Sequence, residues 1–221
     1  MEVPLPALSV RTVSLVDAVS ESLRLAIINA EYEPGSPLTE VRVSEDFGVA
    51  RSTAKAAVER LVAAGFLERS PHRSAQIPRL TEKDVIDLYE TRQIIEGAAV
   101  RRSAASGKSL NDAERAEADL ISAASRGDRD AVATADVAFH TALVEAAGLR
   151  NLADLHAMLM GRAHIAMVQV QRSNPDGAHR SHSEHEQILT AIRSGDGDAA
   201  AEALSQHLSR AQADFRRGSS D

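Results

Sequence analysis

Four residues in the second half of the chain are of types that proteins use to bind divalent metal ions: Asp136, His140, His185 and His207. Asp136 and His140 are four residues apart in a stretch without proline or internal glycine, where Phe139 and Leu143 recur at helical spacing. Both polar side chains therefore lie on the apolar face of one helix. A buried polar group without a partner costs roughly 1–3 kcal/mol or more, so the rest of the chain must supply partners.

Periodicity brings two further histidines to the same interior. His185 precedes Ile188 and Ile192 on one helical stripe, and His207 adjoins Leu208 on another. Three imidazoles and a carboxylate suit Zn²⁺, Ni²⁺, Mn²⁺ or Fe²⁺, with coordination positions left open for water or a ligand. The alternative is that each histidine is a core residue hydrogen-bonded to a neighbour. The remaining histidines are interpreted as surface residues or as residues behind the ligands: His72, His156, His164, His179 and His182.

Arg92 falls on the apolar stripe of a long helix that we expect from Thr81 to about Ala105. An inward guanidinium can clamp the carboxylate of an effector through two parallel hydrogen bonds. The alternative is a structural ion pair with Glu96 or Asp136. Both interpretations place Arg92 near the predicted metal site.

The composition favours close-packed helices. The chain has 221 residues, of which 43% are apolar but only 3% aromatic, and it has no cysteine. Disulfides, thiolate metal sites and cysteine nucleophiles are therefore excluded. No apolar run is long enough to span a bilayer, and residues 1–14 do not resemble a signal peptide, so we expect a cytoplasmic protein that does not bind membranes.

From residue 80 onward the pattern is helical throughout. Helices are predicted for six segments: from Thr81 to about Ala105, Leu110–Ser125, Arg129–Ala147, Asn151–Gln171, Ala178–Arg193 and Ala199–Arg216. The prediction is an antiparallel all-α bundle over residues 80–217 that carries the metal site.

The segment before it has a different order. After a flexible arm at residues 1–14, we expect helices at Leu15–Ala30, from Thr39 to Phe47 and at Arg51–Ala64, and then a β-hairpin of Phe66–Arg69 and Ala75–Pro78. This is the order of a winged helix-turn-helix over residues 15–79, so the fold class is mainly α.

The third helix of that unit would enter the major groove of DNA. Its start offers Arg51, Ser52, Thr53 and Lys55 to base edges and phosphates, and Arg73 lies at the hairpin tip. Although the net charge is −7, residues 35–79 contain seven basic and five acidic residues. The alternative is that these are ordinary solvated side chains at helix ends.

These segments resemble the DNA-binding domain of the GntR family of bacterial transcription regulators. The similarity lies in Leu38-Thr39-Glu40, in residues 47–61 (FGVARSTAKAAVERL) and in Gly65-Phe66-Leu67. The resemblance implies base reading by Arg51, hydroxyl contacts from Ser52 and Thr53, and a second recognition-helix contact from Lys55. The chain departs from the pattern in three places. Arg42, which we also expect to contact DNA, stands one place after the usual arginine. Ala50 replaces a capping hydroxyl residue, and Ser74 replaces the wing-tip glycine.

The second half resembles the FCD ligand-binding domain of the FadR subfamily, in its shorter, VanR-like variant of six helices. All four ligand positions of the metal-binding members are matched by Asp136, His140, His185 and His207. The resemblance implies a homodimer, a small carboxylate bound over the metal, and an effector-binding role for Arg92.

Three functions follow from these features. The leading hypothesis is a transcription regulator, and specifically a repressor, that binds a palindromic double-stranded DNA operator and responds to a small organic acid. The second is a metal-dependent enzyme acting on small organic acids, although the chain has no His-Glu-x-x-His motif. The third is a regulator whose metal is purely structural.

Overall fold

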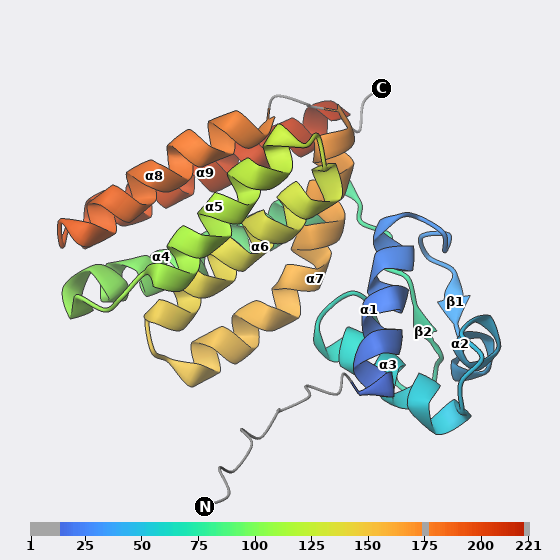
Figure 1. The fold of residues 1–221 in the computed structure, drawn as a ribbon. Helices are drawn as coiled ribbons and strands as arrows, with labels where there is room; N and C mark the ends of the chain where they lie inside the picture. Colours follow the sequence, from blue (N-terminus) through green and yellow to red (C-terminus); the bar gives the residue numbers. More distant parts are fainter. Residues whose placement is uncertain (1–13, 174–176, 219–221) are drawn as a thin grey trace, which may run out of the picture.

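A computed structural model describes residues 14–173 and 177–218 of the chain. The N-terminal part consists of α1 (Leu15–Ile28), β1 (Pro37–Leu38), α2 (Glu40–Asp46), α3 (Arg51–Ala63) and β2 (Ala75–Gln76). Six further helices follow: α4 (Glu82–Ser106), α5 (Asn111–Ser125), α6 (Arg129–Ala146), α7 (Arg150–Ser173), α8 (Gly177–Arg193) and α9 (Gly197–Gly218). Figure 1 shows the two parts side by side, with α7 facing the N-terminal unit. The predicted class, a helix-turn-helix unit followed by an all-α bundle, is confirmed.

Side-chain caps set the start of several helices. The Ser14 side chain accepts a hydrogen bond from the Asp17 amide before α1, and Thr39 caps α2 in the same way. Thr81 and Asp84 form a reciprocal capping box at the start of α4. Ala50 provides no side-chain cap for α3, because its methyl group cannot accept a hydrogen bond. The arm predicted over residues 1–14 lies outside the described residues except for Ser14.

The predicted hairpin is only partly correct. The segment Phe66–Arg69 contributes a single bridge, Glu68 to Gln76, and forms no strand in the described chain. β2 instead pairs antiparallel with β1, where Leu38 lies opposite Ala75. The sequence does not predict β1, because two strand residues between turns leave no alternating pattern to detect.

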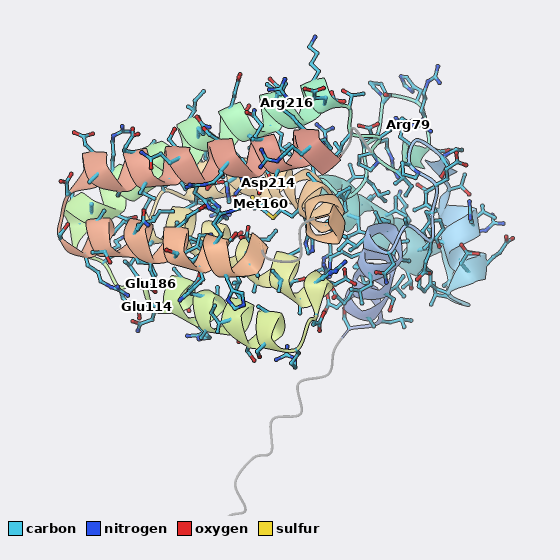
Figure 2. All side chains as sticks on the ribbon, turned by 90° about the horizontal axis from the view of Figure 1, so that it is seen from above. Arg79, Glu114, Met160, Glu186, Asp214 and Arg216 are labelled. Carbon is cyan, nitrogen blue, oxygen red and sulfur yellow. The ribbon has the colours of Figure 1, made fainter. Side chains whose placement is uncertain are left out.

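The six bundle helices agree with the predicted segments to within a few residues. α5 packs on α6, α4 on α9, and α8 on α9. At one edge, Arg193 of α8 bridges Glu114 of α5 at 2.8 Å and Glu186 of its own helix at 4.0 Å, and Figure 2 shows both glutamates there. The ion pair is exposed and contributes little stability, so the bundle depends on its buried apolar stripes.

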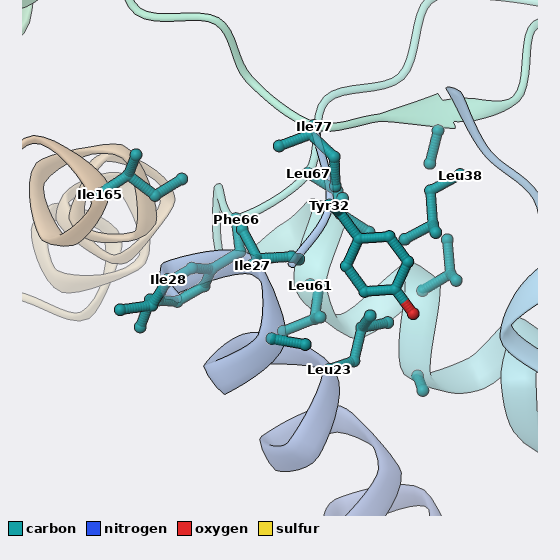
Figure 3. Close-up of a cluster of buried hydrophobic side chains, with 14 of the residues drawn as sticks. Leu23, Ile27, Ile28, Tyr32, Leu38, Leu61, Phe66, Leu67, Ile77 and Ile165 are labelled. Atoms are coloured by element: carbon teal, nitrogen blue, oxygen red, sulfur yellow. The ribbon is translucent and has the colours of Figure 1, made fainter. Parts of the chain in front are cut away.

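The N-terminal unit and the bundle share one hydrophobic core. Residues of α1 and of the segment after α3, including Ile28 and Phe66, form a cluster with residues of α7 such as Ile165. Figure 3 shows Ile165 beside Ile28 and Phe66. The backbones also meet directly, because a Cβ atom at Gly161 would lie 2.2 Å from the carbonyl oxygen of Ala64. The two parts are therefore packed directly against each other.

His164 of α7 is buried in this shared core. The sequence predicted either a surface position or a position behind the metal ligands for this residue. Its ring centroid lies 5.7 Å from that of Phe66, and Nε2 has no partner among the described residues. Burial, reinforced by the positive charge of Arg24, lowers the pKa of His164 to about 4. The folded protein therefore holds this histidine neutral at pH values where the unfolded chain binds a proton.

We expect His164 to make the protein less stable as the pH falls from 6.5 to 4. In that window the unfolded state binds more protons than the folded state, so the free energy of unfolding decreases toward acid. The loss reaches roughly 3 kcal/mol at pH 4 for a pKa difference of this size. Urea unfolding at several pH values should show that His164→Gln flattens this part of the profile. The exposed control His72→Gln should keep the wild-type slope, and identical slopes in both variants would contradict the assignment.

Candidate metal centre

The four predicted metal ligands converge inside the bundle. α6 supplies Asp136 and His140, α8 supplies His185 and α9 supplies His207. All four are buried, and one ligand atom of each lies within 4.8 Å of those of the others. The helical stripes that bury Phe139, Ile188 and Leu208 are the same stripes that turn these polar side chains inward.

The spacing of the ligand atoms fits one shared metal ion. The Nε2 atoms of His140 and His207 are 3.2 Å apart. Two nitrogens bound to one metal at about 2.1 Å lie roughly 3.0–3.4 Å from each other in octahedral or tetrahedral geometry. The Asp136 oxygens are 3.6 Å from Nε2 of His140 and 3.6 Å from Nε2 of His185, so the carboxylate lies between the two rings.

Each of the three imidazoles contacts a carboxylate through Nδ1, the ring nitrogen on the side away from the centre of the cluster. The Nδ1 atom of His140 is 2.7 Å from Glu96, that of His185 is 2.6 Å from Glu117, and that of His207 is 2.7 Å from Glu184. An ionised carboxylate only accepts, so each Nδ1 donates its hydrogen and each Nε2 presents a lone pair to the centre. This is the arrangement in which proteins orient metal-binding histidines.

Sequence reasoning did not identify these three glutamates as supports. Charged residues are expected at exposed positions, so helical periodicity does not single out Glu117. Glu96 was considered only as an ion-pair partner of Arg92. A usable signal was that Glu96 lies four residues after the inward Arg92, on the same helix face.

The electrostatics of the cluster favour a cation at its centre. Burial lowers the pKa of His140, and burial together with the neighbouring His207 lowers that of His185 further, so both rings are held neutral. The Nε2 lone pairs of His140 and His185 then face the Asp136 carboxylate, and all of these are acceptors. Nε2 of His185 has no hydrogen-bond partner among the described residues. The alternative of core histidines bonded to neighbours accounts for the Nδ1 atoms but not for this convergence.

Arg92 lies fully buried beside the cluster. Its Nε donates to Glu96 at 2.7 Å, so the structural ion pair considered from the sequence is formed with Glu96. Although burial alone raises the pKa of Glu96, the charge of Arg92 and the hydrogen bonds from His140 and His156 hold that pKa well below its ordinary value. Both terminal nitrogens of Arg92 and the hydroxyl of Tyr89 have no partner among the described residues. These buried donors are available to an anion.

A cavity of about 50 Å³ adjoins the cluster. Two of the predicted ligands, Asp136 and His207, contribute to its wall together with Tyr89. Ion pairs between α8 and α9 border it, including Arg210 to Glu184 at 2.8 Å. The cavity holds roughly three or four water-sized groups, which is space for a small ligand next to the metal position.

The predicted DNA-contacting residues lie on the N-terminal unit, away from the bundle. Arg42, Arg51, Ser52, Lys55 and Arg73 are exposed, and Thr53 is half-buried. Arg42 pairs with Asp46 and its guanidinium lies 4.9 Å from the ring centroid of Tyr32. Within the described residues, Arg51 and Arg73 have no ion pair. Both charges are therefore available to a ligand.

Comparison with known proteins gives matches to two family models and to full-length relatives. The model "Bacterial regulatory proteins, gntR family" matches residues 15–77, and the model "FCD domain" matches residues 87–210. A probable D-xylose utilization operon transcriptional repressor of Paenarthrobacter nicotinovorans is 24% identical, over 88% of this chain and 86% of its own. The galactonate operon transcriptional repressor of Escherichia coli is 25% identical, over 87% of this chain and 93% of its own. The solved structure of Escherichia coli McbR/YncC shares the fold, with a TM-score of 0.76 at 18% identity over 93% of this chain and 99% of that one.

None of the described helices is both long and apolar enough to cross a bilayer.

We expect Glu117→Gln to weaken metal binding by about 10–100-fold, because the neutral amide holds the His185 ring less firmly and makes it a weaker ligand. Competition with a chromophoric chelator measures the affinity for Zn²⁺. Glu114→Gln is the matched control, since Glu114 is one turn away on the same helix and is exposed. An affinity of Glu117→Gln within twofold of that control would show that Glu117 does not support the site.

Proposed function

The chain belongs to the GntR family of bacterial regulatory proteins and carries an FCD domain, and on this premise we propose that it is a metabolite-responsive repressor. It binds a palindromic double-stranded DNA operator as a homodimer and senses a small carboxylate at a buried divalent metal ion, Zn²⁺, Ni²⁺ or Mn²⁺. The cytoplasm, where DNA and metabolites are accessible, is its place of action. The matching families and relatives are regulators, so the metalloenzyme hypothesis is not retained.

The convergence of four buried ligands is the observation that carries the sensing part of the proposal. Asp136, His140, His185 and His207 would hold the ion, leaving coordination positions for the effector. The ion would supply a positive charge that attracts a carboxylate. The three imidazoles and the Asp136 carboxylate would fix the position of the ion. Glu96, Glu117 and Glu184 hold those imidazoles in place.

The unpartnered donors next to the site support a carboxylate as the effector. Burying the terminal nitrogens of Arg92 and the hydroxyl of Tyr89 without acceptors is costly. Tyr89 lines the adjoining cavity and would donate to a carboxylate there. Arg92 is not part of the cavity wall and lies against the Tyr89 ring, 5.1 Å from its centroid, so a clamp would need the carboxylate to reach past Tyr89, with Arg92 keeping its bond to Glu96 through Nε. The ion pair and the predicted clamp are thus compatible, because they use different nitrogens of one guanidinium.

The DNA-binding part rests on the exposed start of α3. Arg51, Ser52, Thr53 and Lys55 are presented there on one helix of a winged helix-turn-helix, and Arg42 and Arg73 flank them. Two copies in a dimer would place two such helices about one turn of DNA apart, which requires a palindrome. The similarity to repressors of the D-xylose utilization and galactonate operons supports repression as the mode of control.

We expect Arg51→Ala to weaken binding to the operator by about 1–3 kcal/mol, because the variant loses a guanidinium that can bind a base edge bidentately. Fluorescence anisotropy with a duplex selected by the purified protein from a random pool gives the affinity. Arg150→Ala removes an arginine from the bundle whose side chain is 93% exposed, and should leave DNA affinity unchanged. Equal affinities of the two variants would contradict the role of Arg51.

We expect a thermal-shift screen of small carboxylates to give a hit that depends on the metal. A ligand at one hundred times its dissociation constant stabilises the native state by about 2.7 kcal/mol, which for a chain of this size raises the melting temperature by several degrees. The shift should vanish with a chelator and in His140→Ala, and persist in the exposed control His179→Ala. A shift that survives metal removal would favour a purely structural metal.

A further inference from the structure

We infer that α7 mechanically connects the metal centre with the end of the recognition helix α3, through His156 at the centre and Gly161 at α3. This inference rests on the proposed function, since it describes how the state of that site reaches the DNA-binding unit. It concerns two contacts of one helix that lie about 7.5 Å apart along the helix axis, five residues at 1.5 Å per residue.

The first contact joins α7 to the support of a metal ligand. His156 is 1% exposed, and its Nε2 lies 3.0 Å from Oε1 of Glu96. The other oxygen of Glu96 holds Nδ1 of His140 at 2.7 Å. One buried carboxylate therefore links the His140 ring to α7. A movement of that ring cannot leave His156 unaffected unless the hydrogen bond breaks.

The second contact joins α7 to the turn that ends α3. A Cβ atom at Gly161 would lie 2.2 Å from the carbonyl oxygen of Ala64 and 2.5 Å from the amide nitrogen of Phe66. In the reverse direction, a Cβ atom at Gly65 would lie 2.3 Å from the carbonyl oxygen of Met158. No side chain separates the two backbones, so there is no flexible layer to absorb a shift of α7.

The surroundings make this contact rigid. Ile165 of α7 packs with Ile28 and Phe66 in the shared core (Figure 3), and Arg162 pairs with Glu68 at 3.2 Å. Close-packed interiors transmit displacement rather than absorb it. A rearrangement at His140 would therefore reach Ala64, the C-cap of α3, and change the pose of the helix that carries Arg51.

The test measures the α3 end directly, by hydrogen exchange of residues 61–68 with and without Zn²⁺. In the wild type we expect Zn²⁺ to change protection there by fivefold or more, the lower end of typical coupling between sites. In His156→Leu, measured at a Zn²⁺ concentration that saturates the variant, the change in protection should fall below twofold. His156→Gln, whose amide can still donate to Glu96, should restore it, and the exposed control His179→Leu should behave as the wild type.

A second pair of variants tests the contact at α3. Gly161→Ala should keep zinc binding and lose the zinc-dependent change in exchange. Gly97→Ala is its matched control, because a Cβ atom at this mid-helix glycine would meet only Arg101 Nη1, at 3.6 Å. That variant should retain the change.

The outcomes separate this inference from the proposed function. If the wild type binds Zn²⁺ and exchange at 61–68 does not respond, or responds equally in His156→Leu and Gly161→Ala, the role of α7 is overturned while the metal site stands. If the wild type binds no divalent metal, the proposed sensing function fails and the role of α7 fails with it.

Discussion

The convergence of four electron-pair donors on one point is the constraint on which the bundle depends. Three imidazoles and a carboxylate face each other in an interior that provides little solvation. Such a cluster is tolerable when a cation occupies its centre. The carboxylates behind the rings fix the orientation of the nitrogens, so these side chains would not need to rearrange to receive an ion.

Each bundle helix contributes to this constraint while burying its apolar stripe. α6, α8 and α9 carry the ligands, whereas α4, α5 and α8 carry the supporting glutamates. α4 also supplies Arg92, which neutralises Glu96 on one side and leaves two donors for a ligand on the other. α7 contributes no ligand, yet it contacts both Glu96 and the end of α3. In the proposed function, sensing and DNA reading would therefore be joined through packing, without a flexible tether.

Helical periodicity was sufficient to predict the class of fold and to bring Asp136, His140, His185 and His207 to one interior, because each follows the apolar stripe of its own helix. It could not reveal Glu117, whose burial depends on the neighbouring α8, or the burial of His156 and His164, which depends on packing against other segments. β1 was missed because two residues show no period. The contact of Gly161 with Gly65 joins positions almost a hundred residues apart, which no local pattern encodes.

The central claim is that these four residues bind one divalent metal ion. X-ray absorption spectroscopy of the metal in protein purified without chelators, combined with its metal content, tests this most directly. The account predicts one ion per chain with three imidazole nitrogens and a carboxylate oxygen in its first shell, at about 2.0–2.2 Å. A protein that takes up no divalent metal when it is supplied, or a first shell with fewer than three imidazoles, would contradict the account.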